Sequence, residues 1–417
     1  MSRRPTILMI AASSILLLTT GVRQSTGLFL LPIVAATGVS LVSMSFALAI
    51  AQFVWGLAQP LFGAAADRFG TYRVLVLGAL MLAAGGMMAR WNTSAAGFTL
   101  SLGILMAAGT AAGSFAILIG VTTRHLPAEK RSMATGIINA GGSLGQLLFA
   151  PFTQYLIRTA GWSFGMLAVS VAALATIPIS WVFRPGRAEA GTASTALVRG
   201  TAGGRADEAA SMSLREQLRV ALKDRNYLYL HAGFFTCGFH IAFLVTHLPG
   251  NLQLCGLPAT VAANSLALIG GFNVIGSLTV GWLGNRYRMR SILALLYASR
   301  AAVIVCYLAM PKTAFNVYVI AGALGFSWLA TVPPTAGLVG KLFGTRYLTT
   351  LFGLTLLSHQ IGAFLGAWLG GVAMARLGSY DWVWYADVAL ALGAALINLP
   401  IEEAAPRRVV QQRAAAA

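Results

Sequence analysis

Charged side chains are scarce in this sequence: Asp, Glu, Lys and Arg make up 10% of its 417 residues, against roughly 25% in soluble proteins. Hydrophobic residues make up 57%. Apolar runs of about 20 residues recur along the whole chain, each long enough to cross a hydrocarbon layer of about 30 Å. A helix that crosses a bilayer satisfies its own backbone hydrogen bonds. The composition therefore excludes a soluble globular protein and predicts an all-α membrane protein with many spans.

Acidic residues are the scarcest charged group, with 11 Asp and Glu against 29 Lys and Arg and a formal net charge of +18. In a soluble protein this excess would suggest nucleic acid as a partner. Here most of the basic residues fall in alternate loops, from Arg3 and Arg4 at the start to the densest stretch at 184–225. Because positive loops stay in the cytoplasm, the pattern predicts cytoplasmic termini, an even number of spans and no binding of nucleic acid.

Cysteine and nucleotide-binding motifs are also nearly absent. The three cysteines, Cys237, Cys255 and Cys306, lie in or near apolar runs without the spacing of a disulfide framework or a metal site. The sequence has no G-x-x-x-x-G-K-[ST] loop, which excludes an ATP-driven pump. It also places no Ser, His and carboxylate together at one membrane face. We therefore expect no cofactor, no metal and no enzymatic activity.

Apolar runs of spanning length divide the chain into two sets separated by one long interruption at 184–226. This interruption is rich in Gly, Ala, Ser and Thr, and near its end Ser213 and Glu216 predict a capped amphipathic helix. We expect an N-terminal half at 1–183, a cytoplasmic linker at 184–226, a C-terminal half at 227–400 and a tail at 401–417. The twelve predicted spans are 7–34, 43–64, 73–91, 95–122, 131–157, 162–183, 227–249, 258–282, 291–310, 315–340, 349–376 and 382–400.

The two halves repeat one another in a nearly constant register. "GVRQSTGLFLLP" at 21–32 aligns with "GFHIAFLVTHLP" at 238–249. In the same way "GAAADRFGTYRVL" at 63–75 aligns with 281–293, and "ATGIINAGGSLGQ" at 134–146 aligns with 351–363. Duplicated halves of this kind occur in transporters, where the substrate binds near the membrane midplane between the repeats.

The stretch "GAAADRFGTYRVL" between the second and third predicted spans resembles the signature loop of the major facilitator superfamily, roughly G-x-x-x-D-R-x-G-x-[RK]-[RK]. Gly63, Asp67, Arg68, Gly70 and Arg73 stand at its positions, and we expect them to form a loop that gates conformational change. With the spans and the repeat, this resemblance implies the major facilitator fold, in which twelve transmembrane helices form two pseudo-symmetric six-helix halves that work by alternating access.

Three segments resemble the monocarboxylate/oxalate transporter branch of that superfamily, in particular its bacterial YcxA-like members. They are "GVRQSTGLFLLP", "HLPAEKRSMATGIINAGGSLGQ" and "CGFHIAFLVTHLP". The resemblance implies transport of small organic anions, often coupled to protons. Two departures matter for the coupling: Asn273 and Ser277 replace an Asp and Arg pair of the mammalian-type carriers, and Arg23 replaces a lysine.

Ionised groups inside a bilayer cost at least about 2.5–3.5 kcal/mol and usually face the protein interior, so each is a candidate functional residue. Arg23 lies near mid-depth of the first span, and its guanidinium fork suits a carboxylate. Asp387 is the one carboxylate deep in a span, and that span is predicted to be an outer one. We therefore expect an anionic substrate as the partner of Arg23. His240 stands at the equivalent place in the second half, where we expect it to face Arg23 across a cavity.

The other polar residues within spans carry a weaker signal. His247, one heptad after His240, is a second candidate for proton coupling, together with His240 itself. Arg300 favours a structural role, in which it bonds carbonyl groups or Asp387. Ser and Asn in spans also serve to join helices. The remaining candidate substrate-binding residues are Trp55, Asn139, Ser143, Asn273, Ser277, His359 and Gln360.

These features predict a secondary transporter of small organic anions, mono- or dicarboxylates, with Arg23 binding the carboxylate and a proton as candidate co-substrate. The alternative is an efflux antiporter of the same fold for neutral drugs or metabolites. Cationic drugs are disfavoured because spans one, four, seven and ten carry no acidic residue. We expect a monomer in the bacterial inner membrane, surrounded by lipid, with both termini in the cytoplasm.

Overall fold

The computed structural model describes residues 3–124, 128–184, 213–284, 286–344 and 347–403, and within these ranges the regular structure is helical throughout. The N-terminal half consists of α1 (Arg3–Ser25), η1 (Thr26–Phe29), α2 (Leu30–Thr37), α3 (Leu41–Phe69), α4 (Thr71–Trp91), α5 (Ala95–Phe98), η2 (Thr99–Met106), α6 (Ala107–Ala112), α7 (Phe115–Arg124), α8 (Ala128–Ala172), η3 (Ala173–Ala175), α9 (Thr176–Ser180) and η4 (Trp181–Phe183).

A short helix precedes the C-terminal half. This is α11 (Leu214–Ala221), and it begins with the predicted capping box, because Ser213 accepts from the Glu216 N–H and the Glu216 carboxylate accepts from the Ser213 N–H. The half itself consists of α12 (Arg225–Leu254), α13 (Ala259–Leu283), α14 (Met289–Ala309), α15 (Ala314–Ser327), α16 (Val332–Phe343), α17 (Leu348–Leu377) and α18 (Asp381–Asn398).

Ten helical segments among the described residues are long and apolar enough to cross a membrane. The longest, Gly136–Phe183, reverses its direction at Gly161, whose φ is 81°, and so crosses twice. The helix α18 adds a further crossing beside α14 and α12. The twelve predicted spans are therefore present, and the protein has the fold of a two-part helical bundle.

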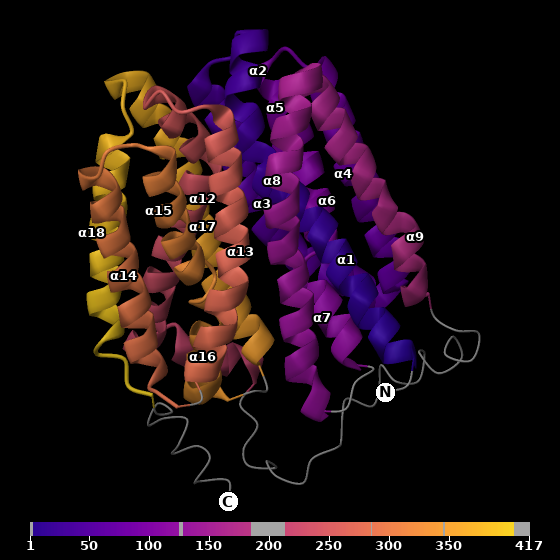
Figure 1. Cartoon of the computed structure of the whole chain (residues 1–417). Coiled ribbons are helices and arrows are strands. Elements are labelled where there is room, and N and C mark those ends of the chain that lie inside the picture. Colours follow the sequence, from indigo (N-terminus) through magenta and orange to yellow (C-terminus); the bar gives the residue numbers. More distant parts are fainter. Residues whose placement is uncertain (1–2, 125–127, 185–212, 285, 345–346, 404–417) are drawn as a thin grey trace, which may run out of the picture.

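The two halves lie side by side (Figure 1), and the contacts between their helices follow an approximate twofold symmetry. α1 packs most extensively on α8, and its counterpart α12 packs in the same way on α17. Gly141 and Gly145 of α8 meet backbone carbonyls of α1. Gly362 and Gly366 of α17 meet carbonyls of α12. Between the two halves, α3 packs on α17 and α13 packs on α8. These two contacts correspond to each other under the same symmetry.

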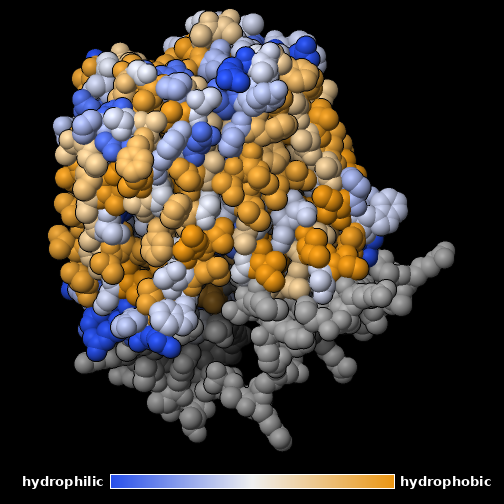
Figure 2. All heavy atoms as spheres, viewed as in Figure 1, coloured by the Kyte–Doolittle hydropathy of each residue, from blue (hydrophilic) through white to orange (hydrophobic). Residues whose placement is uncertain are grey.

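Hydrophobic side chains cover the middle of the molecular surface, and hydrophilic ones gather at its two ends (Figure 2). Leu278 and Leu295, 61% and 70% exposed, are two of many large apolar side chains on this surface. An exposed apolar surface of this extent is typical of a membrane environment. Helix α1 begins at one end of the bundle, and α18 ends at that same end (Figure 1). We call this end, where α11 also lies, the linker face, and the other end the far face.

The predicted loop between the second and third spans is not a loop. Helix α3 continues to Phe69 and α4 begins at Thr71, so Gly70 alone separates them, with φ 88°. The prediction was wrong because hydropathy marks the edge of the hydrocarbon layer, whereas the helix continues through the polar residues beyond it. Asp67, Arg68 and Arg73 are accordingly exposed on helical turns at the linker face.

Candidate functional site

Arg23 lies near the middle of the first span, which runs from Thr6 to Thr37. The α-helix ends two residues later and tightens into the 3-10 turn η1. The Arg23 Nη2 donates to Gln52 Oε1 at 2.5 Å, and the guanidinium carbon lies 3.9 Å from the centroid of the Trp55 ring. Among the described residues Arg23 forms no ion pair with a carboxylate. In the described part of the chain, its positive charge is therefore held by an amide oxygen and an indole face.

A small pocket surrounds this arginine. Its lining comes from α1, η1, α3, η2 and α6, and it is mainly apolar. The open volume is about 20 Å³, which holds about one water molecule, so a carboxylate must widen the pocket to enter. The lining residues are Arg23, Thr26, Leu48, Ala51, Gln52, Trp55, Leu102, Met106, Ala107 and Thr110.

The C-terminal half reaches this region through α17. Gly56 of α3 leaves no room for a side chain, since a Cβ there would lie 2.2 Å from the Gln360 Cγ. The neighbouring His359 has Nδ1 3.3 Å from Gln360 Nε2 and is close enough to Arg23 to feel its charge. His359 and Gln360 are 7% and 1% exposed. Two of the predicted candidates on α17 thus lie at the boundary between the halves, beside the Arg23 pocket.

The candidates on α8 and α13 form a separate contact between the halves. Asn273 Nδ2 donates to Ser143 Oγ at 2.9 Å, and Asn273 Oδ1 accepts from Ser277 Oγ at 3.3 Å. The same Oδ1 accepts from the Leu329 N–H at 3.0 Å. Asn139, one turn before Ser143, is half-buried. Asn273 therefore connects the two halves through Ser143, and it also binds the backbone amide of Leu329 in the tenth span.

The predicted histidines His240 and His247 do not line the Arg23 pocket. His240 Nδ1 lies 2.5 Å from Asp387 Oδ2 of α18, and both side chains are 0% exposed. His247 Nε2 donates to the Ala367 carbonyl at 2.6 Å. The His240–Asp387 pair was not predicted from the sequence, although a lone carboxylate deep in a span signals that a donor must face it.

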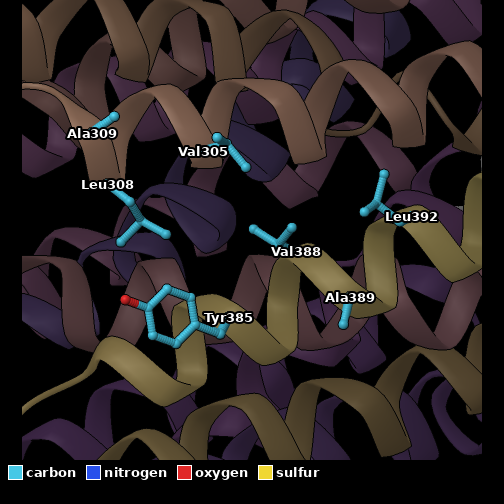
Figure 3. Close-up of a pocket in the computed structure, with 7 residues that line it drawn as sticks. All are labelled: Val305, Leu308, Ala309, Tyr385, Val388, Ala389 and Leu392. Atoms are coloured by element: carbon cyan, nitrogen blue, oxygen red, sulfur yellow. The ribbon is translucent and has the colours of Figure 1, made fainter.

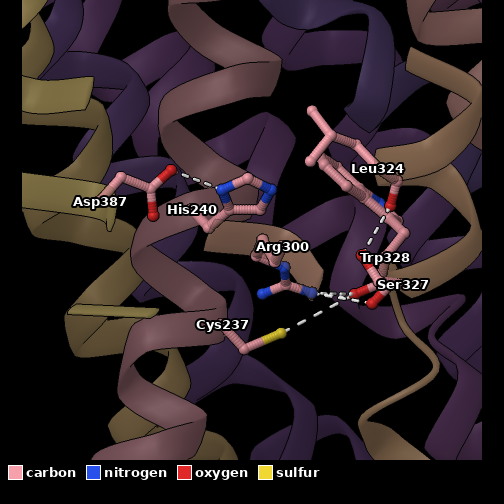
Figure 4. Close-up of polar contacts among 7 residues, drawn as sticks. All are labelled: Cys237, His240, Arg300, Leu324, Ser327, Trp328 and Asp387. Carbon is pink, nitrogen blue, oxygen red and sulfur yellow. Dashed lines mark hydrogen bonds and ion pairs between the residues drawn. The ribbon is translucent and has the colours of Figure 1, made fainter. Parts of the chain in front are cut away.

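Span ten consists of α15 and α16, and it is broken from Trp328 to Thr331. Arg300 lies beside this break (Figure 4). Helix α16 begins with two prolines at its first turn, and proline cannot donate to the preceding turn. At the end of α15, the Ser327 and Trp328 carbonyls accept from Arg300 Nη2 at 2.8 and 3.2 Å. The predicted bonding to carbonyl groups is confirmed. The signal for the break itself, "TVPPT" at 331–335, is visible in the sequence.

A second cavity has an almost entirely apolar lining. It lies between α14 and α18, and its lining is apolar apart from the Tyr385 hydroxyl (Figure 3). Tyr385 and Leu392 are 64% and 48% exposed, as expected of a groove that faces lipid. It therefore does not compete with the Arg23 pocket as a functional site.

Two symmetric six-helix halves with a charged residue at mid-depth between them define a membrane transporter. The model of the Major Facilitator Superfamily matches residues 12–367. The chain therefore belongs to the major facilitator superfamily, and it is a transporter rather than an enzyme.

Named relatives extend this assignment. The chain is 26% identical to monocarboxylate transporter 13 of Rattus norvegicus, covering 91% of this chain and 85% of that protein. It is 24% identical to the MFS-type transporter YcxA of Bacillus subtilis, covering 84% and 83%, and 22% identical to the oxalate:formate antiporter of Oxalobacter formigenes, covering 89% and 85%. The structure of a D-xylose–proton symporter shares the fold with a TM-score of 0.73 at 14% identity, over 95% of this chain and 97% of that one.

Proposed function

We propose that this protein transports small organic anions, mono- or dicarboxylates, by alternating access, and that Arg23 binds the carboxylate. The observation that carries the proposal is the charge of Arg23 at mid-depth in a pocket, where no carboxylate of the described residues pairs with it. A charge in this environment is retained only where a partner repays its desolvation. An anion that enters the pocket supplies that partner.

The neighbours of Arg23 fit this role. Gln52 holds one Nη group and Trp55 covers one face of the guanidinium, so the remaining donors of the planar fork are held in a fixed direction. His359 and Gln360 of the opposite half lie at the same boundary. A substrate between them touches both halves, which is what allows its binding to affect their relative orientation.

The names of the relatives support the same class of substrate. They include carriers of monocarboxylates and an exchanger of oxalate and formate. Each of these molecules offers a carboxylate to an arginine fork. The positions of the basic residues support a cytoplasmic linker face, and we propose a monomer in a bacterial inner membrane with that orientation.

The test is a thermal-shift screen of the purified protein with formate, oxalate, lactate and gallate. Ligand at 100 times its Kd stabilises the folded state by about 2.7 kcal/mol. We expect at least one of these anions to raise the melting temperature of the wild type. Arg23→Gln removes a charge-assisted bond worth about 1.5–3 kcal/mol, so the shift should require roughly ten- to a hundredfold more anion.

Arg90→Gln is the matched control. Arg90 also lies beside an indole, with its guanidinium carbon 5.8 Å from the Trp91 ring, but both residues are exposed. This variant should respond to the anions as the wild type does. The proposal fails if no carboxylate stabilises the wild type, or if Arg23→Gln responds at the same concentrations. Stabilisation by neutral compounds alone would favour an efflux antiporter instead.

A further inference from the structure

Three ionisable side chains are buried together in the C-terminal half, away from the Arg23 pocket. His240 of α12, Arg300 of α14 and Asp387 of α18 are each 0% exposed. His240 Nδ1 lies 2.5 Å from Asp387 Oδ2, and Arg300 is close enough to act electrostatically on the imidazole. Figure 4 shows the guanidinium between the imidazole and the break in span ten.

The surroundings of His240 contain few other charged or titratable groups. Helix α14 also presents Tyr297, whose hydroxyl donates to the Gly233 carbonyl. Helix α17 presents His359, and α12 itself carries Cys237, whose sulfur lies 3.3 Å from Thr331 Oγ1. Helix α13 has no titratable side chain. The balance of charge around His240 is therefore set by Arg300 and Asp387.

The imidazole has one nitrogen left for a further proton. With Asp387 ionised, His240 Nδ1–H is the donor of their hydrogen bond, which leaves Nε2 with its lone pair. His240 Nε2 and Asp387 Oδ1 have no hydrogen-bond partner in the described part of the chain. Histidine is also the side chain whose charge normally changes between about pH 5 and 8.

We propose that His240 and Asp387 form a proton-binding site, and that Arg300 links its occupancy to the break in span ten. Without the proton, Arg300 and Asp387 balance each other and the cluster is neutral. One proton, taken by His240 Nε2, raises its net charge to +1. Like charges in a buried cluster repel strongly, so protonation weakens the hold of Arg300 on its present position.

That position is what supports the broken helix. Arg300 donates to the Ser327 and Trp328 carbonyls, and the next backbone amide, that of Leu329, donates to Asn273. Asn273 in turn donates to Ser143 of the other half. A movement of Arg300 therefore changes the geometry at the boundary between the halves. The proton site does not depend on the proposed function, but its use in anion transport rests on it.

Trp328 provides a test without any substrate. Its ring lies 5.8 Å from that of His240, and an imidazolium quenches the fluorescence of a neighbouring indole. The difference in emission between the wild type and Trp328→Phe isolates this residue among the nine tryptophans. We expect the difference to decrease on acidification. Asp387→Asn should move the midpoint to lower pH by about one unit or more, because the opposite charge is lost.

His240→Gln should abolish the transition, whereas the control His247→Gln should retain it, because His247 lies further along α12 and bonds the Ala367 carbonyl of α17. The proposal is overturned if the emission of Trp328 does not change with pH in the wild type. It is equally overturned if the transition survives in a folded His240→Gln variant. Elution as a single species in gel filtration shows that each variant is folded.

Proteoliposomes test the link to transport. A gradient of one pH unit supports about tenfold accumulation of an anion carried with one proton. With oxalate or lactate as probe, we expect Asp387→Asn to lower the ratio of gradient-driven accumulation to exchange by roughly that factor. Asn273→Ala should lower this ratio too while keeping the fluorescence transition. If Asp387→Asn leaves the ratio of gradient-driven accumulation to exchange unchanged, the coupling is refuted. If the wild type exchanges no carboxylate, the proposed function is refuted. The proton site itself is tested separately, by the fluorescence of Trp328.

Discussion

Two arginines lie inside the bundle, and their contacts separate their roles. Arg300 is fully buried and donates to two backbone carbonyls that a broken helix leaves free. Arg23 is half-buried, bonds one amide oxygen and stacks on one indole. A guanidinium has five N–H donors, so most donors of Arg23 remain for a ligand. The same residue type is thus a structural element in one half and a candidate ligand-binding residue in the other.

Trp55 is expected to set the direction in which Arg23 presents its donors. Its ring lies 3.9 Å below the guanidinium, a cation–π contact worth about 0.5–2 kcal/mol. Trp55→Leu should therefore weaken carboxylate binding about two- to thirtyfold, as measured by the anion concentration at half-maximal thermal shift. Trp91→Leu is the control. Equal affinity in Trp55→Leu and the wild type would show that the indole does not orient the arginine.

Glu403 is expected to make the linker face sensitive to acid. Its carboxylate accepts from Lys341 Nζ at 2.8 Å and from the Arg290 N–H at 3.0 Å. Partial burial favours a higher pKa, but these hydrogen bonds outweigh it and hold the pKa of Glu403 below its usual value. A carboxyl group whose pKa is depressed in the folded state stabilises the protein above the unfolded-state pKa, and this stability is lost as pH falls through the folded pKa.

Melting temperatures over an acidic pH series measure this effect. The wild type should lose stability below the usual glutamate range. Glu403→Gln should be less stable at neutral pH and should lose less on acidification. Parallel curves for the two proteins would show that other carboxylates are responsible for the acid sensitivity.

At the scale of single elements, interruptions of helices coincide with the candidate sites. The first span changes to a 3-10 turn at Thr26, close to Arg23, and span ten breaks where Arg300 and Asn273 bond its backbone. An interrupted helix exposes carbonyl and amide groups that a continuous helix would use itself. The interruptions therefore create the polar contacts that join the two halves in an otherwise apolar interior.

The junction of α3 and α4 depends on a single glycine. Gly70 has φ 88°, and a Cβ there would meet nothing within 4 Å, so the cost of Gly70→Ala is backbone strain alone, about 1–3 kcal/mol. Gly63 lies in the helix, also with open space beside it, and Gly63→Ala should be neutral or stabilise by up to about 1 kcal/mol. Melting temperatures of the two variants measure the difference. Equal values would contradict a special role of the Gly70 backbone.

At the scale of the whole molecule, the halves meet most closely towards the far face. A Cβ at Gly27 of η1 would lie 1.8 Å from the Val245 carbonyl oxygen of α12. Gly371 of α17 leaves no room beside Ser45 of α3. Small alanines of both halves, among them Ala49 and Ala367, pack together between these points. Close backbone contacts of this kind are broken and remade together when two halves rock.

Gly27→Ala should therefore open the far face. The clash with a backbone carbonyl costs about 1–3 kcal/mol, which shifts the population about five- to a hundredfold. Leu31 lies beside Gly250 across the same contact. Leu31→Cys, in protein that also carries Cys255→Ser and Cys306→Ser, reports opening of the far face by its rate of reaction with an impermeant maleimide. Gly393→Ala, where a Cβ meets nothing within 4 Å, is the control. An unchanged labelling rate would show that this contact does not close the far face.

Much of the fold follows from the sequence, because hydropathy and repeats are properties of local segments. The predicted spans, the relation between the two halves and the capping box of α11 appear in the structure. The partners of the buried charges do not follow in this way. His240 was expected to face Arg23, yet it bonds Asp387, which is far along the chain.

The sequence by itself determined that this chain crosses a membrane as two related sets of helices with Arg23 at mid-depth, since the length and apolarity of a segment decide whether it enters a bilayer. The tertiary structure decided which side chains meet: Arg23 with Gln52 and Trp55, Arg300 with a broken span ten, and His240 with Asp387. The physical reason is rotation. A helix that is apolar on every face can turn about its axis without changing its hydropathy, and only close packing at glycines and the need to pair buried polar groups fix that angle.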